Sequence, residues 1–171
     1  LNPVSVNTTV QFHNPAFCPK PGDGTGLYEA AEEAKKAGKI RHIGITNHRL
    51  AVAKEAIESG LYETLQFPFC YLASEKDIEL VNLCKEKNVG FICMKPMAGG
   101  ALEDARLAMR FIGRNENVSV VIPGMYDVRE IDQNIEAIED ASPLTEAERA
   151  QLDVIRRELG TQFCRRCNYC Q

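Results

Sequence analysis

The fold of this chain is decided by one short stretch, Gly38-Lys39-Ile40-Arg41-His42-Ile43-Gly44-Ile45-Thr46-Asn47. A lysine-rich helix is expected to end at Gly38, and the apolar run that follows has the pattern of a strand buried on both faces. Thr46 and Asn47 close the strand where the next helix begins. Because parallel α/β folds bind ligands at the carboxyl ends of their strands, we expect these two side chains on the ligand side.

The composition is that of a globular domain with a sizeable core. The chain has 171 residues, 44% of them hydrophobic, and a net charge of −4. Its basic residues are scattered, which argues against a nucleic-acid surface. The sequence has no apolar run of about 18 residues and no signal-peptide pattern, so we expect neither a membrane span nor secretion.

The placement of the seven cysteines favours reduced thiols over a disulfide framework. Cys18, Cys70, Cys84 and Cys93 are dispersed, and the last three lie in apolar segments where a thiol can pack. The other three are clustered at the end of the chain. An odd count with one tight cluster predicts a cytoplasmic protein with a metal site.

Buried strands recur along the chain with one helix between each pair. They are centred on Ile43, Leu65, Phe91 and Val120. Such βα units imply a parallel sheet covered by helices, either doubly wound or closed into a (β/α)8 barrel. The absence of a Gly-x-Gly-x-x-Gly turn favours the barrel. With the strand that ends at His13, we predict an α/β fold containing about the last five βα units of a (β/α)8 TIM barrel.

Helix patterns separate these strands. Two helices are expected to bury apolar stripes, formed by Leu27, Ala30, Ala31 and Ala34 in the first and by Val128, Ile131, Ile135 and Ile138 in the second. Two further helices are expected to open with capping boxes, Ser74 with Asp77 and Thr145 with Glu148.

Four motifs in this order resemble the aldo/keto reductase family, and the match runs from Val10 to Asp140. They are Gln11-Phe12-His13-Asn14-Pro15, the opening stretch, Leu65-Gln66-Phe67, and Ile122-Pro123-Gly124 followed by Gln133-Asn134. The tail from Cys164 resembles the ferredoxin-type extension of one branch of that family. The resemblance implies a barrel part over residues 1–142 and a helix with an iron–sulfur segment over residues 143–171.

His13 is the catalytic candidate. A histidine beside Asn-Pro is commonly a loop hydrogen-bonder, but the resemblance implies that His13 orients a substrate carbonyl for hydride transfer. The family's Asp, Tyr and Lys partners lie on the amino-terminal half of the barrel and are not present. Because the chain also begins with Leu1 rather than Met, we expect a carboxyl-terminal fragment that is inactive alone.

The resemblance implies that Thr46, Asn47 and Gln66 bind the nicotinamide carboxamide of NAD or NADP. A helix cap is the simpler interpretation of Thr46 and Asn47, and the two roles are compatible. Lys95 could reach a cofactor phosphate, although an exposed lysine at a strand end needs no such role. Met94 lies where the family often carries a ring that stacks on the nicotinamide.

Gly124, Gln133 and Asn134 match the family's pyrophosphate and adenine region. Where many members carry an arginine for the 2′-phosphate of NADP, this chain has Glu130. Because a 2′-phosphate needs charge-assisted partners, we predict a reduced preference for NADP.

The three clustered cysteines, Cys164, Cys167 and Cys170, have the spacing of iron–sulfur ligands. A 4Fe-4S cluster is expected, with an incomplete ligand set, and zinc is the alternative metal. The alternative function is a non-catalytic module that serves metal binding or electron transfer. The open edges of a partial barrel sheet also predict self-association of the chain. The other expected partner, implied by the family resemblance, is a small carbonyl substrate.

Overall fold

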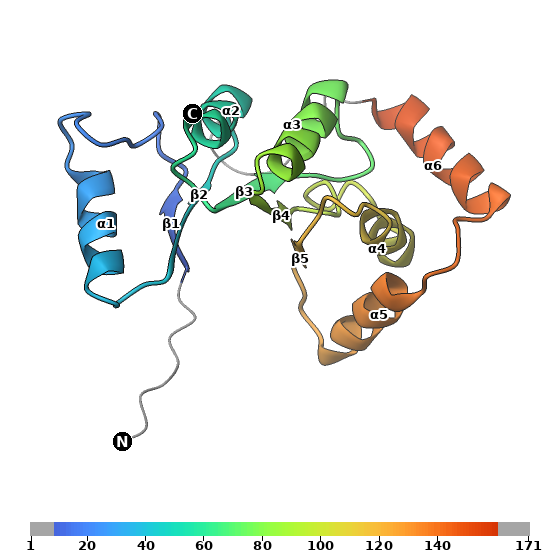
Figure 1. Cartoon of the computed structure of the whole chain (residues 1–171). Coiled ribbons are helices and arrows are strands. Elements are labelled where there is room, and N and C mark those ends of the chain that lie inside the picture. Colours follow the sequence, from blue (N-terminus) through green and yellow to red (C-terminus); the bar gives the residue numbers. More distant parts are fainter. Residues whose placement is uncertain (1–8, 161–171) are drawn as a thin grey trace, which may run out of the picture. The chain divides into compact units, whose positions relative to one another are not determined.

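Strands and helices alternate along the chain (Figure 1), of which this computed structural model describes residues 9–160. The elements are β1 (Thr9–His13), α1 (Leu27–Lys36), β2 (His42–Thr46), α2 (Leu50–Ser59), β3 (Thr64–Pro68), α3 (Glu75–Glu86), β4 (Gly90–Met94), α4 (Ala105–Gly113), β5 (Val120–Ile122), α5 (Val128–Glu139) and α6 (Glu146–Leu159).

The five strands form one sheet in the order β1-β2-β3-β4-β5. The pairs β1–β2, β2–β3 and β4–β5 are parallel. Each strand therefore lies beside the next in sequence, whereas a doubly wound sheet would place later strands on both sides of the first. This order confirms the predicted arrangement, a singly wound run of βα units that is part of a (β/α)8 barrel.

Two compact units make up the described chain. The first contains the residues up to Phe67 together with Leu80–Phe91, and the second contains Pro68–Glu79 and the residues from Ile92 onward. Among residues 9–160, no helix is long and apolar enough to span a membrane.

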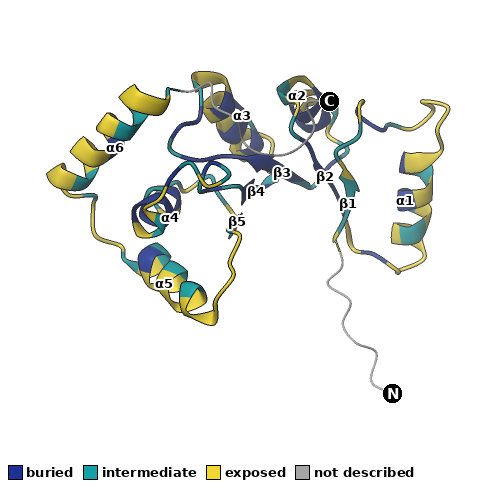
Figure 2. Cartoon of the chain, turned by 180° about the vertical axis from the view of Figure 1, so that it is seen from behind, coloured by how far each residue is buried: buried dark blue, intermediate teal, exposed yellow. Residues whose placement is uncertain are grey.

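The first unit is built around β2, as the opening stretch predicts. The strand begins at His42, two residues after the start of the apolar run. Its residues Ile43 and Ile45 are 2% and 0% exposed, as predicted for a buried strand. Most of β2 is in the dark blue of buried residues in Figure 2, whereas β3 also contains intermediate positions. At Gly44, an added Cβ would overlap the Oγ1 of Thr64, on β3, and would lie 3.2 Å from the carbonyl oxygen of Thr64. Glycine therefore fits this position.

The apolar stripe predicted for α1 is partly wrong. Ala31 is buried, but Leu27 is 45% exposed and the neighbouring Tyr28 is 4% exposed. Tyr28 turns inward because its ring packs against Phe12 and Tyr62, with centroids 6.4 and 5.8 Å away. The aromatic partners on other elements therefore outweigh the helical periodicity.

In the second unit, a core forms between the loop after β3, the loop after β4 and α4. Its buried members are Cys70, Leu72, Ala98, Leu102 and Ala108. The predicted capping box of Thr145 opens α6 with both of its hydrogen bonds present. At α3, Ser74 accepts from the Asp77 N–H, and Asp77 accepts from the Ser74 N–H at 2.9 Å, so that box is confirmed too.

The apolar stripe predicted for α5 is exposed at three of its four residues. Val128, Ile131 and Ile135 are 75%, 42% and 48% exposed, and much of α5 is yellow in Figure 2. The last member of the stripe, Ile138, is partly buried and packs beside the buried Ala137, because Gly113 at the end of α4 admits the Ile138 backbone at close range. On β5, Val120 and Ile122 are likewise exposed, so the predicted burial of this strand is wrong.

Candidate active site

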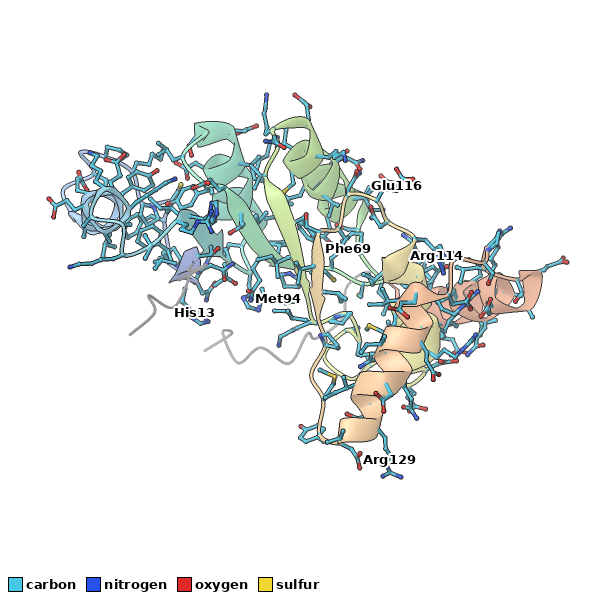
Figure 3. All side chains as sticks on the ribbon, turned by 60° about the horizontal axis from the view of Figure 1, so that its bottom comes forward. His13, Phe69, Met94, Arg114, Glu116 and Arg129 are labelled. Carbon is cyan, nitrogen blue, oxygen red and sulfur yellow. The ribbon has the colours of Figure 1, made fainter. Side chains whose placement is uncertain are left out.

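Three predicted site residues lie side by side at the carboxyl ends of neighbouring strands. His13 ends β1, Thr46 ends β2, and Gln66 lies in β3. In the sheet register, the Cα of His13 pairs with that of Thr46, and Thr46 pairs with Gln66. Thr46 is 3% exposed, whereas His13 is exposed at its strand end (Figure 3). A hydroxyl, an amide and an imidazole thus share one row of the first unit.

Backbone hydrogen bonds continue this row beyond the strands. The N–H of Asn14 donates to the carbonyl oxygen of Thr46 at 2.7 Å, and the N–H of Asn47 donates to that of Gln66 at 3.1 Å. The chain therefore keeps its register for one residue past β1 and β2. This fixes the backbone from which the side chains of the row project.

Asn47 is enclosed within the first unit. It is 0% exposed, its Nδ2 donates to the carbonyl oxygen of Pro15 at 2.9 Å, and its Oδ1 accepts from the N–H of Arg49 at 2.8 Å. Arg49 precedes α2 and supplies no side-chain cap of its own. Asn47 therefore stabilises the turn that precedes α2, but it is not the helix cap, because the N-cap residue is Arg49.

The second unit carries the other predicted residues. Met94, at the end of β4, is 7% exposed and pairs with Ile122 of β5. Lys95 follows it with a left-handed backbone, at a φ of 55°. Gly124 follows β5 in an exposed loop, where an added Cβ would meet no atom within 4 Å.

Helix α5 presents the predicted adenine-region residues. Gln133 is exposed and Asn134 is partly buried. In the first turn, Glu130 accepts a hydrogen bond from the N–H of Tyr126 at 2.7 Å. The guanidinium of the exposed Arg129 (Figure 3) is paired at 2.8 Å with Asp127, the residue that caps the start of α5. This helix start therefore carries two carboxylates, those of Asp127 and Glu130, and one cation, Arg129, whose charge is paired with Asp127.

Three tyrosines have structural partners. The hydroxyl groups of Tyr28 and Tyr62 donate to the carbonyl oxygens of Leu61 and Pro19, and that of Tyr71 donates to Asp153. Burial raises the pKa of all three phenols. A general acid near neutral pH needs a lowered pKa, so these tyrosines are poor proton donors.

Four cysteines occur as buried thiols: Cys18, Cys70, Cys84 and Cys93. Burial raises the pKa of Cys84 and of Cys93 to about 12, which suits packing rather than metal binding. Within residues 9–160, no three His, Cys, Asp or Glu side chains are arranged to hold a metal ion. The predicted ligands Cys164, Cys167 and Cys170 lie outside the described residues.

Sequence reasoning missed one residue of this site. Asn14 has a left-handed backbone, with a φ of 49°, and its Oδ1 accepts from the N–H of His48 at 3.2 Å. The available signal was an Asn-Pro pair directly after a strand, because asparagine tolerates this conformation better than other residues with side chains.

Known proteins resemble this chain in sequence and in fold. Residues 9–107 match the sequence profile of the Aldo/keto reductase family. An uncharacterized oxidoreductase of Schizosaccharomyces pombe is 26% identical over an alignment of 119 positions; the match covers 60% of this chain and 39% of that protein.

Two solved structures show the same fold. The holo form of an aldo-keto reductase from Bacillus halodurans has a TM-score of 0.66 and 22% identity, covering 86% of this chain and 60% of its own. An aldo-keto reductase from Klebsiella pneumoniae in complex with NADPH has a TM-score of 0.66 and 20% identity, covering 86% and 57%. The chain thus spans well under two thirds of each of these proteins. Because the family profile matches more than half of its 171 residues, the chain belongs to the aldo/keto reductase family.

Proposed function

We propose that the protein is an oxidoreductase that transfers hydride between a nicotinamide cofactor and a small carbonyl or alcohol substrate. The observation that carries this proposal is the row of His13, Thr46 and Gln66 at the carboxyl ends of three neighbouring parallel strands. Ligands bind at this end of (β/α)8 barrels. Membership of the aldo/keto reductase family supports the same reaction class.

In this proposal His13 is the residue that contacts the substrate. Its exposed imidazole, at the end of β1, would donate a hydrogen bond to the carbonyl oxygen and stabilise the negative charge that develops there. A bound nicotinamide cofactor supplies the hydride for reduction and accepts it for oxidation.

The polar groups beside His13 fit a carboxamide. A carboxamide has both N–H donors and a carbonyl acceptor, and the hydroxyl of Thr46 and the amide of Gln66 offer both kinds of group. The Asn47 amide bonds Pro15 and Arg49, and these bonds hold it at the end of β2 beside Thr46. We therefore assign Thr46, Asn47 and Gln66 to the nicotinamide end of the cofactor.

Four residues of the second unit are also proposed to bind the cofactor. We assign Lys95 and Gly124 to the pyrophosphate, since one offers a cation and the other an open backbone position. Gln133 and Asn134 on α5 are assigned to the adenine end. Glu130 would repel a 2′-phosphate, so we propose a weaker preference for NADP than the family resemblance implies; the NADPH-bound relative supports a nicotinamide cofactor in general.

We also propose that these 171 residues turn over poorly by themselves. Tyr28, Tyr62 and Tyr71 are engaged in structural hydrogen bonds, and the family's Asp, Tyr and Lys partners have no match in the sequence. Residues 1–142 would then supply part of a barrel. Residues 143–171 would supply a helix and an iron–sulfur segment.

For that segment we propose a 4Fe-4S cluster bound by Cys164, Cys167 and Cys170. Three thiolates spaced two residues apart match ferredoxin-type ligands, and structural zinc commonly uses two separated pairs. The cysteines in the described part of the chain are buried thiols, which fits a reducing, cytoplasmic environment.

Self-association of the chain is proposed from its second unit. An exposed apolar stripe on α5 is formed by Val128, Ile131 and Ile135. The short strand β5, which precedes α5 in the sequence, also exposes apolar side chains. Such surfaces favour contact with another protein surface. Sedimentation should show oligomers that dissociate in the variant Ile131→Lys, whereas Asp132→Lys on the same helix should leave them intact.

Cofactor binding to the 171-residue chain tests the central proposal. The sequence contains no tryptophan, so the fluorescence of NADH can be followed without competing protein emission. We expect saturable binding that Thr46→Val and Gln66→Leu each weaken by about tenfold, the loss of one good hydrogen bond. Thr9→Val, at the opposite end of β1, is the matched control. Absence of saturable binding, or an equal loss in the control, contradicts the proposal.

A further inference from the structure

Two asparagines hold the ends of β1 and β2 together, each reaching the loop that follows the other strand. The Oδ1 of Asn14 accepts from the N–H of His48 at 3.2 Å, and the Nδ2 of Asn47 donates to the carbonyl oxygen of Pro15 at 2.9 Å. Between these two bonds, the N–H of Asn14 donates to the carbonyl oxygen of Thr46 at 2.7 Å. Residues 14 and 15 thus make three hydrogen bonds to residues 46–48.

The backbone at Asn14 is as constrained as its side chain. Its φ of 49° lies in the left-handed region, which asparagine adopts more readily than alanine does. This turn ends β1 directly after His13 and sends the chain toward Pro15, which has no N–H to offer. The turn is held by the two hydrogen bonds of Asn14 itself, from its N–H to Thr46 and from the His48 N–H to its Oδ1.

We propose that Asn14 is a positioning residue for His13. Its left-handed turn and its bond to His48 hold the last residue of β1 against the end of β2, so that the imidazole keeps one orientation beside Thr46. This inference rests on the proposed function, in which His13 contacts the substrate. Asn14 acts through His13 and does not itself contact the reacting atoms.

Three substitutions separate the two contributions of Asn14. Asn14→Ala loses the acceptor and is strained at positive φ, whereas Asn14→Gly loses the acceptor without that strain. Asn14→Asp keeps both the acceptor and the tolerance for a left-handed backbone. If the orientation of the His13 imidazole depends on the hydrogen bond to His48, N14A and N14G should change that orientation to the same extent. N14D should leave it unchanged.

The test is NMR of the histidines in the 171-residue chain. The chain has three of them, and His42, at the other end of β2 and bonded to Glu63 at 2.7 Å, is an internal reference. In N14A and N14G we expect the His13 imidazole signals to move toward those of an unfolded chain. The His48 amide should exchange about tenfold faster, as expected for the loss of one hydrogen bond. In N14D the His48 amide should keep its protection.

Asn88→Ala is the matched control, because Asn88 has a left-handed backbone too, with a φ of 56°, in the loop before β4. It should lose stability from the same strain and leave the His13 signals unchanged. Unchanged His13 signals in a folded N14G overturn the positioning role, as does an equal shift in N88A. If N14A fails to fold, N14G and N14D still decide the question. The proposed function is tested by a separate measurement, NADH binding to the wild-type chain. Absence of that binding would contradict the proposed function and would not bear on the positioning role of Asn14.

Discussion

The Nε of Arg110, on α4, lies 2.9 Å from Oε1 of Glu148 in the first turn of α6. Arg110 is 2% exposed although it carries a full charge. Its guanidinium is paired with Asp140 and bonds the carbonyl oxygen of Pro143 at 3.3 Å as well. One buried cation therefore connects α4, the end of α5 and the start of α6.

The first prediction concerns the stability of the second unit. Arg110→Ala should lower its free energy of unfolding by about 3 kcal/mol, because two carboxylates lose a buried partner. Arg106→Ala is the control: Arg106 pairs with the same Asp140 and Glu148, but its side chain is 63% exposed. Its loss should cost less than about 1 kcal/mol. Urea titration measures both, and equal losses would contradict the role of burial.

The second prediction is an acid transition at the start of α6. The hydrogen bond from the N–H of Thr145, together with Arg110, lowers the pKa of Glu148 from 4.5 to about 2. Because the folded-state pKa is the lower one, the stabilisation is complete above pH 4.5 and is lost as the pH falls toward 2. Glu148→Gln should reduce this pH dependence in a circular dichroism titration. Glu146→Gln, in the same turn, should retain it.

The third prediction is that Gly44 tolerates no side chain. A Cβ there would overlap the Oγ1 of Thr64 and approach its carbonyl oxygen to 3.2 Å. We expect Gly44→Ala to destabilise the first unit by about 1–3 kcal/mol, and Thr64→Ala in the same chain to restore part of the loss. Gly124→Ala, at an open position, should change stability by less than about 0.5 kcal/mol. Thermal unfolding of these three variants and of the unsubstituted chain completes the comparison.

The fourth prediction concerns cofactor choice. Glu130→Arg should strengthen NADPH binding relative to NADH by about tenfold, since a guanidinium can bond a phosphate where a carboxylate repels it. Asp132→Arg makes the same charge change about 200° around the helix and should leave the ratio unchanged. Fluorescence titration with both cofactors gives the ratio. A wild-type chain that already binds NADPH much more tightly would refute the assignment of Glu130.

The fifth prediction concerns the clustered cysteines. Anaerobic reconstitution with iron and sulfide should give a brown protein with broad absorption at about 400 nm, as expected for an iron–sulfur cluster. Serine in place of Cys164, Cys167 or Cys170 should abolish the colour, while Cys84→Ser should keep it. A colourless protein that retains zinc would show the alternative metal.

The alternation of elements was predictable from sequence because it depends on local patterns. Buried apolar runs identified β2 and β4, and the row of His13, Thr46 and Gln66 follows once consecutive strands lie side by side in parallel. The helix faces were less predictable. Where α5 packs on α4, the small residues Ala137 of α5 and Gly113 of α4 permit a close approach, and hydrophobic periodicity alone does not distinguish that position from the one occupied by Ile131 and Ile135.

Interactions between distant residues were not predictable. Arg110 lies on the buried side of α4, and its partners Asp140 and Glu148 come 30 and 38 residues later. No local pattern connects them. Likewise, the role of Asn14 depends on His48, which is 34 residues away. Both are polar contacts that form only after the helices and strands have packed together, so no local sequence pattern indicates them.

The buried thiols give each unit its own reporter of local opening. Cys84 belongs to the first unit and Cys93 to the second, and both side chains are 0% exposed. An alkylating reagent can reach each sulfur only while its surroundings are open, so the labelling rate reports the population of that open form. Mass spectrometry of the two cysteine peptides would therefore measure local opening of the first and of the second unit separately, within one native sample.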